Sequence, residues 1–338
     1  MKKISDFGTL GAGNDAPIFQ LAFDYARVNN VALECDYAGD LHMSAPISYI
    51  TDSANTFTPG LIVVGQGADK TNIINEHGGL DFICATSAPY KFQRHGVIEG
   101  FTFKGIGSGP KLASCFNYQL NGLQIEGKTD HGLYLPTLLG DADASNNISL
   151  EQVRIDNCGK WGVFGKVTPG VNELSFLAFR NVLIQGCGNL QTTIGGGMYW
   201  RGQQFSMEQV AFVLNNNRGL YIEGGSGLGS DVTGRNVTFE NNVGIHLQCY
   251  GIKNMVFDSL QMYSNDQYRT TYGMKIAAES SVASNIHIRS GIVRATAGNN
   301  PHVAFCGTGA NLSNAKAQNI YWDNFGYAGQ TKMLGFTS

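Results

Sequence analysis

A short phrase, glycine followed by an apolar residue, any residue and a second apolar residue, recurs along the chain in HGLYLP (131–136), WGVFGK (161–166), GGMYWR (196–201), RGLYIE (218–223), VGIHLQ (243–248), YGMKIA (272–277) and, with His for Gly, PHVAFC (301–306). A second phrase, as in NISLEQVRI (147–155) and FSMEQVAF (205–212), recurs with a similar spacing of roughly 22–35 residues. Both alternate apolar and polar residues, which is typical of β-strands. One such unit cannot bury its own apolar face, so the pattern predicts a stack of repeats.

The predicted fold class is all-β: a right-handed, single-stranded parallel β-helix with an N-terminal capping helix. A leucine-rich repeat is disfavoured because its Leu/Asn signature is absent, and a propeller blade would need about 40 residues. Asn and Gly at the turns are expected to form sharp corners, where stacked Asn side chains bond along the coil. One domain is predicted over 1–338, with a helix-containing cap segment (1–30), irregular early rungs (31–130), regular rungs (131–327) and a C-terminal tail (328–338).

The composition excludes several classes of protein. Charged residues make up 14% of the chain, against about 25% in average proteins, and 44 of the 338 residues are Gly. The hydrophobic share of 43% excludes disorder, and a net charge of −3 gives no case for binding nucleic acid. The N-terminus shows no apolar signal segment, and no apolar run is long enough for membrane insertion. The seven Cys are interpreted as reduced, packed thiols of a chain that folds in the cytosol.

The N-terminal sequence ISDFGTLGAGNDAPIFQLAFDYA (4–26) resembles the opening of pectate-lyase-like β-helix proteins, especially bacteriophage tailspikes and depolymerases. LIVVGQGADKTNII (61–74) resembles the next phrase of that family. Two positions depart from the pattern, at Ala16–Pro17 and at Asp36. The resemblance implies polysaccharide processing, a homotrimer and attachment to a virion tail, although such folds also host non-enzymes. The residues that carry the resemblance are Asp6, Phe7, Gly8, Gly11, Gly13, Asp15, Phe19, Ala22, Gly65, Gly67, Thr71 and Ile73.

The strand alternation also predicts which side chains point outward. The second residue after each glycine anchor should form an outward, mainly aromatic column: Tyr134, Phe164, Tyr199, Tyr221, His246 and Lys275. The fourth residue adds a neighbouring column that includes Arg201 and Glu223. Aromatic rings pack on the apolar faces of sugars while polar groups bond hydroxyls, so these residues are the predicted substrate-binding surface. The alternative is that the column forms a subunit interface or lies beneath a loop.

Glycoside hydrolysis needs two carboxyl groups, about 5 Å apart in retaining enzymes and roughly 6.5–9.5 Å apart in inverting ones. Glu223 is the acid beside the aromatic column, and Asp231, Asp141 or Asp143 is its expected partner. A lyase would instead use Tyr199, Arg201, Tyr221, His246 or Lys275 as a base or to neutralise an acidic sugar. No metal or other cofactor is expected, because no cluster of ligands has a recognisable spacing.

A further column alternates in charge and is interpreted as structural, because stacked opposite charges neutralise each other. The predicted function is a tailspike-type depolymerase that binds a bacterial capsular, O-antigen or exopolysaccharide and cleaves it, preferably by hydrolysis. It would assemble in the host cytoplasm and act outside the cell on a virion tail. The alternatives are a polysaccharide lyase of the same fold and a non-catalytic glycan-binding or structural β-helix. The alternating column consists of Glu151, Arg180, Glu208, Arg235, Asp258, Arg289 and Asp323.

Overall fold

A computed structural model describes the whole chain except 52–56, 87–91, 137–145, 166–174, 190–194, 224–230, 251, 253, 266–269, 278–283, 296–301, 305–317, 323–324, 329–332 and 335–338. The chain divides into two compact units. Unit 1 comprises Met1–Gly159 and Val163–Ala178, and unit 2 comprises Lys160–Gly162 and Phe179–Ser338. The predicted single domain stays a prediction.

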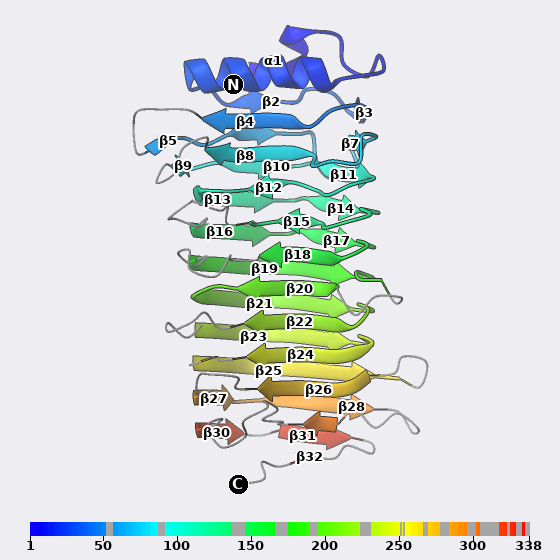
Figure 1. Cartoon of the computed structure of the whole chain (residues 1–338), viewed down its shortest axis with the longest axis vertical. Helices are drawn as coiled ribbons and strands as arrows, with labels where there is room; N and C mark the ends of the chain where they lie inside the picture. The colour runs from blue at the N-terminus through cyan, green and yellow to red at the C-terminus, as the bar shows by residue number, and fades with distance from the viewer. Residues whose placement is uncertain are drawn as a thin grey trace. The chain divides into compact units, whose positions relative to one another are not determined.

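Within each unit, parallel strands form two sheets, and each coil of the chain adds strands beside the equivalent strands of the coil before it (Figure 1). In unit 1, for example, Ile47 pairs with Phe82 in one sheet and Val63 pairs with Ile98 in the other. In unit 2, Leu220 pairs with Leu247, and Val232 pairs with Met255. This arrangement confirms the predicted all-β parallel β-helix.

The first sheet, here called sheet B, contains β4, β8, β12, β15, β18, β20, β22, β24, β26, β29 and β32, and the other strands belong to sheet A. Besides the helices η1 (Ile4–Phe7) and α1 (Ala16–Asn29), the strands of unit 1 are β1 (Lys2–Lys3), β2 (Leu33–Glu34), β3 (Gly39–Met43), β4 (Ile47–Thr51), β5 (Phe57–Pro59), β6 (Ile62–Val64), β7 (Thr71–Asn75), β8 (Phe82–Thr86), β9 (Phe92–Arg94), β10 (Val97–Glu99), β11 (Thr102–Gly105), β12 (Lys111–Leu112), β13 (Cys115–Asn121), β14 (Gln124–Glu126), β15 (Leu133–Tyr134), β16 (Asn146–Glu151) and β17 (Arg154–Asp156). Strands with residues in both units are β18 (Trp161–Gly165) and β19 (Ser175–Gln185).

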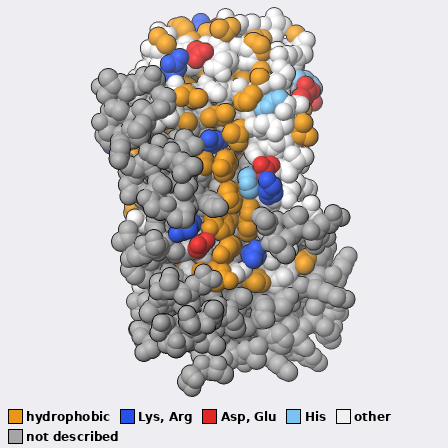
Figure 2. All heavy atoms as spheres, viewed as in Figure 1, with side chains coloured by type: hydrophobic (Ala, Val, Ile, Leu, Met, Phe, Trp, Pro, Cys, Tyr) orange, Lys and Arg blue, Asp and Glu red, His pale blue; other side chains and the backbone are white. Residues whose placement is uncertain are grey.

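The strands of unit 2 are β20 (Gly196–Arg201), β21 (Gln204–Val213), β22 (Arg218–Glu223), β23 (Asp231–Glu240), β24 (Gly244–Tyr250), β25 (Asn254–Ser264), β26 (Thr270–Ala277), β27 (Ser284–Ile288), β28 (Gly291–Ala295), β29 (His302–Ala304), β30 (Gln318–Trp322), β31 (Phe325–Ala328) and β32 (Met333–Leu334). In the described part of the chain, no helix is long and apolar enough to cross a membrane. Figure 2 shows one face of the molecule, on whose coloured part most side chains are apolar or uncharged and several of the few charged ones lie beside a side chain of opposite charge.

The sequence predicts an amphipathic helix over 14–29, and helix α1 begins two residues later, at Ala16, and ends at Asn29. Pro17 lies in its first turn, where a missing N–H costs nothing, so the departure from the family pattern at that position suits a helix start. The apolar face of α1 packs into unit 1: the rings of Phe19 and Phe23 lie 6.1 Å and 5.2 Å from that of Phe82, a buried residue of β8. The capping role of the helix stays a prediction.

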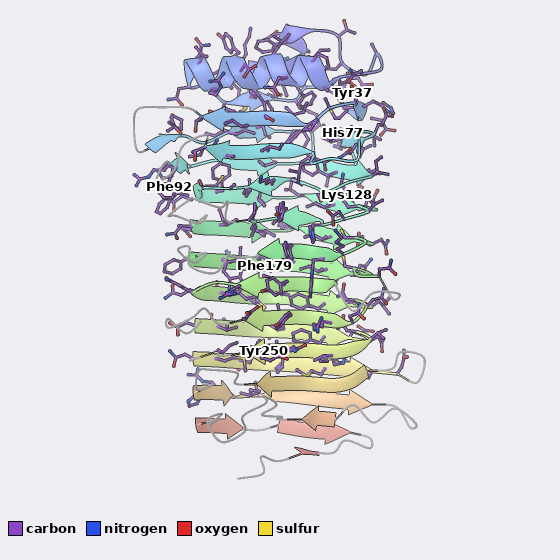
Figure 3. The ribbon with its side chains drawn as sticks, viewed as in Figure 1. Tyr37, His77, Phe92, Lys128, Phe179 and Tyr250 are labelled. Carbon is purple, nitrogen blue, oxygen red and sulfur yellow. The ribbon has the colours of Figure 1, made fainter. Side chains whose placement is uncertain are left out.

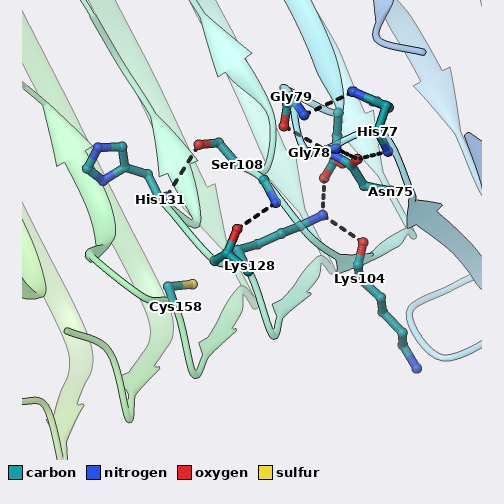
Figure 4. Close-up of polar contacts among 12 residues, drawn as sticks. Asn75, His77, Gly78, Gly79, Lys104, Ser108, Lys128, His131 and Cys158 are labelled. Carbon is teal, nitrogen blue, oxygen red and sulfur yellow. Dashed lines mark hydrogen bonds and ion pairs between the residues drawn. The ribbon is translucent and has the colours of Figure 1, made fainter. Parts of the chain in front are cut away.

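A buried ion pair lies in the interior of unit 1 (Figure 4). The Lys128 Nζ lies 2.7 Å from the Asp81 Oδ2, and neither side chain is exposed. The same ammonium donates to the Lys104 carbonyl at 2.8 Å, and the Asn75 amide donates to the other Asp81 oxygen at 2.8 Å. Burial raises the pKa of Asp81 to about 6 and lowers the pKa of Lys128, because each ionised group loses water. Each charge is therefore compensated inside the protein, and loss of either partner would leave the other buried and unpaired.

In unit 2, buried asparagines join successive coils, as predicted for the Asn-rich corners. The Asn215 amide donates to the Ile184 carbonyl at 3.0 Å and to the Asn242 Oδ1 at 2.9 Å. Asn242 in turn donates to the Phe212 carbonyl at 2.8 Å and to His246 Nδ1 at 3.1 Å. Both asparagines are fully buried, so these bonds satisfy backbone groups that water cannot reach at the corner.

From Arg180 to Asp258 the alternating charged column lies on sheet A of unit 2 with the predicted pairing of opposite signs, whereas Glu151 belongs to β16 of unit 1. The Arg180 Nε lies 3.3 Å from the Glu208 Oε2, and Arg235 is in register between Glu208 and Asp258. The residue after each of these acids and bases bends the strand: Gln209, Asn236 and Ser259 have φ values of 56°, 53° and 61°. Polar residues are suited to this left-handed corner, which supports a structural role for the column. Asp323 lies outside the described residues.

The described cysteines are all free and buried, as the sequence predicted. They are Cys35, Cys84, Cys115, Cys158, Cys187 and Cys249, while Cys306 lies outside the described residues. Burial raises the pKa of Cys35 and of Cys84 to about 12, because the thiolate would lose its water. These side chains therefore act as small apolar residues of the interior.

Candidate functional site

The candidate site lies on the outward side of sheet B in unit 2, where β20, β22 and β24 lie side by side (Figure 1). Their register places Tyr199 beside Tyr221 and Tyr221 beside Gln248. The next outward position aligns Arg201, Glu223 and Tyr250. The inward positions between them hold buried side chains such as Trp200 and Ile222, so the two outward columns stand on a rigid core.

Aromatic rings form a connected row in this site. The Tyr199 ring lies 5.7 Å from the Trp161 ring and 5.1 Å from the Tyr221 ring, and Tyr221 lies 5.5 Å from Tyr250. Figure 3 labels Tyr250 on β24 at one end of the row. We call Trp161, Tyr199, Tyr221 and Tyr250 the aromatic row. The Tyr199–Tyr221 and Tyr221–Tyr250 contacts are edge-to-face, a geometry that stabilises the rings.

A carboxylate, a phenol and a guanidinium meet beside the row. The Tyr199 hydroxyl donates a hydrogen bond to the Glu223 Oε2, and the Arg201 Nη1 lies 3.4 Å from the Glu223 Oε1. The Glu223 side chain is 31% exposed and the Arg201 side chain 15%. Among the described residues, the buried Arg201 Nε has no hydrogen-bond partner. This nitrogen can donate to an acceptor on a ligand.

Tyr199 is a proton donor in this arrangement. Its burial, followed by its hydrogen bond to Glu223, raises the pKa of its hydroxyl well above the usual value. The phenol is therefore neutral at any physiological pH, whereas Glu223 is the acceptor of the group. The Tyr199 hydroxyl and the Glu223 carboxylate share a proton, and the Arg201 guanidinium places a positive charge beside them. Acid–base chemistry on a sugar requires such groups.

A second chain of polar contacts supports the other side of the row. The Arg218 guanidinium lies 5.2 Å from the centre of the Tyr221 ring, and its Nε donates to the Gln248 Oε1 at 2.6 Å. The Gln248 amide then donates to the Tyr250 hydroxyl at 2.7 Å. Sequence reasoning did not assign Trp161, Arg218 or Tyr250 to the site, and it placed Gln248 next to Glu223, whereas the register places Gln248 beside Tyr221. A two-residue shift in the register of β24 would have identified Gln248 and Tyr250.

The predicted outward orientation of His246 is wrong. In the register of sheet B this residue lies beside Gly219 and Gly273, at the anchor position, and its side chain is 1% exposed. The Asn242 amide donates to its Nδ1, and its Nε2 lies 2.9 Å from the Ser264 hydroxyl. Burial lowers the pKa of His246 to about 3, so the imidazole is a neutral core group without access to a substrate.

The other predicted catalytic acids are not placed beside Glu223 by any described contact. Asp231 begins β23 in sheet A, where its Oδ1 accepts a hydrogen bond from Asn254 at 2.6 Å. Asp141 and Asp143 lie outside the described residues. Lys275 pairs in register with Gln248, which places it in the predicted column, although its side chain is not described.

Two predicted binding residues, Tyr134 and Phe164, form a separate stack in unit 1. Their rings lie 5.8 Å apart and nearly parallel, and the His131 ring stacks on Phe164 at 4.3 Å. The Lys111 Nζ lies 6.0 Å from the centre of the Tyr134 ring.

Within the described part of the chain, no group of His, Cys, Asp and Glu side chains could hold a metal ion.

No protein-family model and no curated protein matches the sequence. Among solved structures, the A-module of the mannuronan C-5 epimerase AlgE6 from Azotobacter vinelandii matches with a TM-score of 0.61 and 12% identity over 100% of both chains. Tailspike protein 2 of the Escherichia coli O157:H7 bacteriophage CAB120 matches with a TM-score of 0.55 and 11% identity over 95% of this chain and 41% of that chain. The N-terminal fragment of bacteriophage Phi29 gene product 12 matches with a TM-score of 0.50 and 13% identity over 96% of this chain and 65% of that chain.

These similarities define the class of fold. The protein has a parallel β-helix like that of the epimerase A-module and of tailspike protein 2, and this agrees with the fold expected from the resemblance in its N-terminal sequence. Phage tailspikes share this architecture.

Proposed function

We propose that the protein binds and cleaves a bacterial surface polysaccharide, with the partly exposed Tyr221 and Tyr250 of the aromatic row as the binding platform, the buried Trp161 and Tyr199 behind them, and Glu223 as the central carboxylate. The observation that carries the proposal is the contact of Tyr199 and Arg201 with Glu223 beside aromatic rings that pack edge-to-face. Aromatic rings beside charged hydrogen-bonding groups suit the two faces of a sugar. The similarity in fold to a tailspike and to an enzyme named for its action on mannuronan supports a polysaccharide as substrate.

The preferred reaction is hydrolysis of the glycosidic bond, in which Glu223 acts as nucleophile or base. A second carboxylic acid would protonate the leaving oxygen. Asp231, Asp141 and Asp143 remain the candidates for this acid, and Asp231 would have to exchange its hydrogen bond with Asn254 for the substrate. Tyr134, Phe164 and Lys275 remain proposed binding residues, whereas His246 is excluded by its burial.

The second candidate reaction is elimination by a polysaccharide lyase, and the Tyr199–Glu223–Arg201 group favours it. The Arg201 guanidinium would neutralise the carboxylate of an acidic sugar, which makes the neighbouring C–H proton easier to remove. Glu223 would accept that proton and the neutral Tyr199 phenol would protonate the leaving oxygen. This reaction needs one carboxylate on the protein instead of two.

Product analysis distinguishes these reactions. The protein would be incubated with a panel of bacterial capsular, O-antigen and exopolysaccharides, and binding, new reducing ends and ultraviolet absorbance would be measured. New reducing ends without absorbance would indicate hydrolysis, and both together would indicate elimination, because elimination leaves an unsaturated sugar. In either case Tyr199→Phe should lower the rate. Binding without products would indicate a glycan-binding protein that is not an enzyme. No binding to any member of the panel would contradict the proposal.

We also propose that the protein is a homotrimer attached to a phage tail and that it acts outside the host cell. The support is its β-helix fold, shared with tailspike protein 2, and the scarcity of charged side chains on the described part of the face in Figure 2. Light scattering at micromolar concentration should give three times the chain mass of 36.4 kDa. A mass equal to that of one chain would contradict the assembly.

A further inference from the structure

Unit 1 has a hollow on sheet A that the proposed function does not use. It has a volume of about 310 Å³ and lies over β10, β13 and β16. We call it the unit 1 hollow. Its lining consists of His95, Gly96, Val97, Asn117, Tyr118, Gln119, Asn147 and Ser149. Figure 1 shows β13 and β16 one beneath the other, and they pair in parallel.

The hollow arises from a bend repeated on successive coils. His95, Asn117 and Asn147 have φ values of 62°, 55° and 56°, which are left-handed conformations. The register places Phe116 beside Asn146 and Tyr118 beside Ile148, so the bends of β13 and β16 align. The bend turns the polar side chains of these residues toward a common space. The Asn147 amide donates to the Asn117 Oδ1 at 2.5 Å, which holds the two side chains together.

The floor of the hollow is rigid. A Cβ atom at Gly96 would lie 2.1 Å from the Tyr118 ring, so glycine is required where the coil passes over this ring. Tyr118 is fully buried, and its hydroxyl accepts a hydrogen bond from the Leu61 N–H at 3.0 Å and donates to the Gln93 side chain. The polar groups above the ring are therefore held by a fixed base, which lowers the entropy cost of binding.

The chemistry of the lining selects the class of ligand. Imidazole, carboxamide and hydroxyl groups line the hollow, and none of the eight lining residues is Asp, Glu, Lys or Arg. Such groups both donate and accept hydrogen bonds without charge, as sugar hydroxyls require. The volume lies at the lower end of the range for small-ligand sites, about 300–1,000 Å³. The aromatic row of unit 2, in contrast, carries Arg201 and Glu223 and suits a charged sugar.

We propose that the unit 1 hollow is a second carbohydrate-binding site, which takes an uncharged sugar unit and carries out no cleavage. The assignment of a sugar, rather than another hydroxylated molecule, rests on the proposed function. No carboxyl group belongs to the lining, so the hollow lacks the acids that glycoside hydrolysis requires. Its effect would be to hold a neutral part of a long polysaccharide independently of the reaction in unit 2.

Nuclear magnetic resonance of the full chain tests this proposal. The His95 ring signals would be followed during titration with short dextran, mannan and galactan fragments and, for comparison, with a short polyuronate fragment. At least one neutral fragment should shift the His95 signals at millimolar concentration, and the polyuronate should not. If none of the three neutral fragments shifts these signals, or if the polyuronate alone does, the proposal is overturned.

Two substitutions locate the binding. Ser149→Trp places a large ring in the hollow and should weaken binding of the neutral fragment by at least roughly tenfold, while Gln119→Leu should weaken it severalfold through a lost hydrogen bond. Ser206→Trp, at an exposed position of β21 in unit 2, is the matched control and should bind normally. Unchanged binding by a folded Ser149→Trp protein would overturn the proposal.

Cleavage assays separate this proposal from the proposed function. Ser149→Trp should cleave short substrates at the normal rate, whereas Glu223→Gln should still bind the neutral fragment. If the normal protein cleaves nothing but its His95 signals shift, the proposed reaction fails and the second binding site stands. If the normal protein cleaves the polysaccharide but its His95 signals do not shift, the proposed reaction stands and the second binding site is overturned.

Discussion

Replacing Glu223 by Gln should lower the rate of polysaccharide cleavage by roughly 10²–10⁴-fold while the polysaccharide still binds. The amide keeps the size of the side chain and can accept a hydrogen bond from the Tyr199 hydroxyl, but it can neither attack a sugar nor take a proton. The aromatic row does not depend on this charge. The measurements are product formation at saturating substrate and, separately, binding of the same polysaccharide.

A matched control is available on the other sheet of unit 2. Glu208 belongs to the alternating charged column and pairs with Arg180 at 3.3 Å, and its side chain is 44% exposed. The Glu208→Gln protein should cleave at the normal rate, because an exposed ion pair contributes only about 0–1 kcal/mol to stability and Glu208 takes no part in the proposed reaction. Full activity in Glu223→Gln with a loss in Glu208→Gln would move the reaction to the column that we interpret as structural.

Acid should destabilise the protein through His246. Below about pH 6.5 the unfolded chain binds a proton on this imidazole, whereas burial keeps the folded chain from binding one until about pH 3. Its contribution to stability is therefore complete above the unfolded pKa and is lost as the pH falls toward the folded pKa. From about pH 7 to about pH 4.5 the contribution of His246 to the free energy of unfolding should fall by on the order of 2–3 kcal/mol.

Two measurements check this second prediction. Denaturant unfolding at several pH values should show a shallower acid decline for His246→Gln than for the normal protein, because Gln carries no titrating proton. In the folded normal protein, the His246 ring signals should not titrate between about pH 7 and about pH 5. A midpoint near pH 6.5 would show that the ring is open to solvent.

The repeats made the fold predictable because each one encodes the same alternation of buried and exposed residues. The register of β24 was not predictable in the same way. In VGIHLQCY (243–250) the phrase starts at Gly244, yet Gly244 forms a corner with φ 85° and the strand shifts beside it. The anchor position is occupied by His246, whose polar ring is accommodated by hydrogen bonds to Asn242 and Ser264. A buried imidazole breaks the alternation on which the prediction depended.

The candidate site was predictable in part for a related reason. Tyr199, Tyr221, Arg201 and Glu223 lie on regular strands, so alternation alone placed them together. Trp161 joins them from a different coil, and its contact with Tyr199 depends on side-chain packing that strand alternation does not specify. The acids Asp141 and Asp143 belong to a segment of variable length between repeats. Periodicity carries no information about such a segment.

The burial of the cysteines has a consequence for redox behaviour. A thiol with a pKa of about 12, such as that of Cys35 or Cys84, is ionised in about one molecule in 10⁵ at neutral pH, and disulfide exchange proceeds through the thiolate. The six described thiols are also enclosed by the coils, so oxidants and other thiols do not reach them in the folded state. A folded molecule can therefore pass from a reducing to an oxidising medium without cross-linking through these six positions. A cysteine introduced on the surface would then react with a thiol-specific label far faster than any of them.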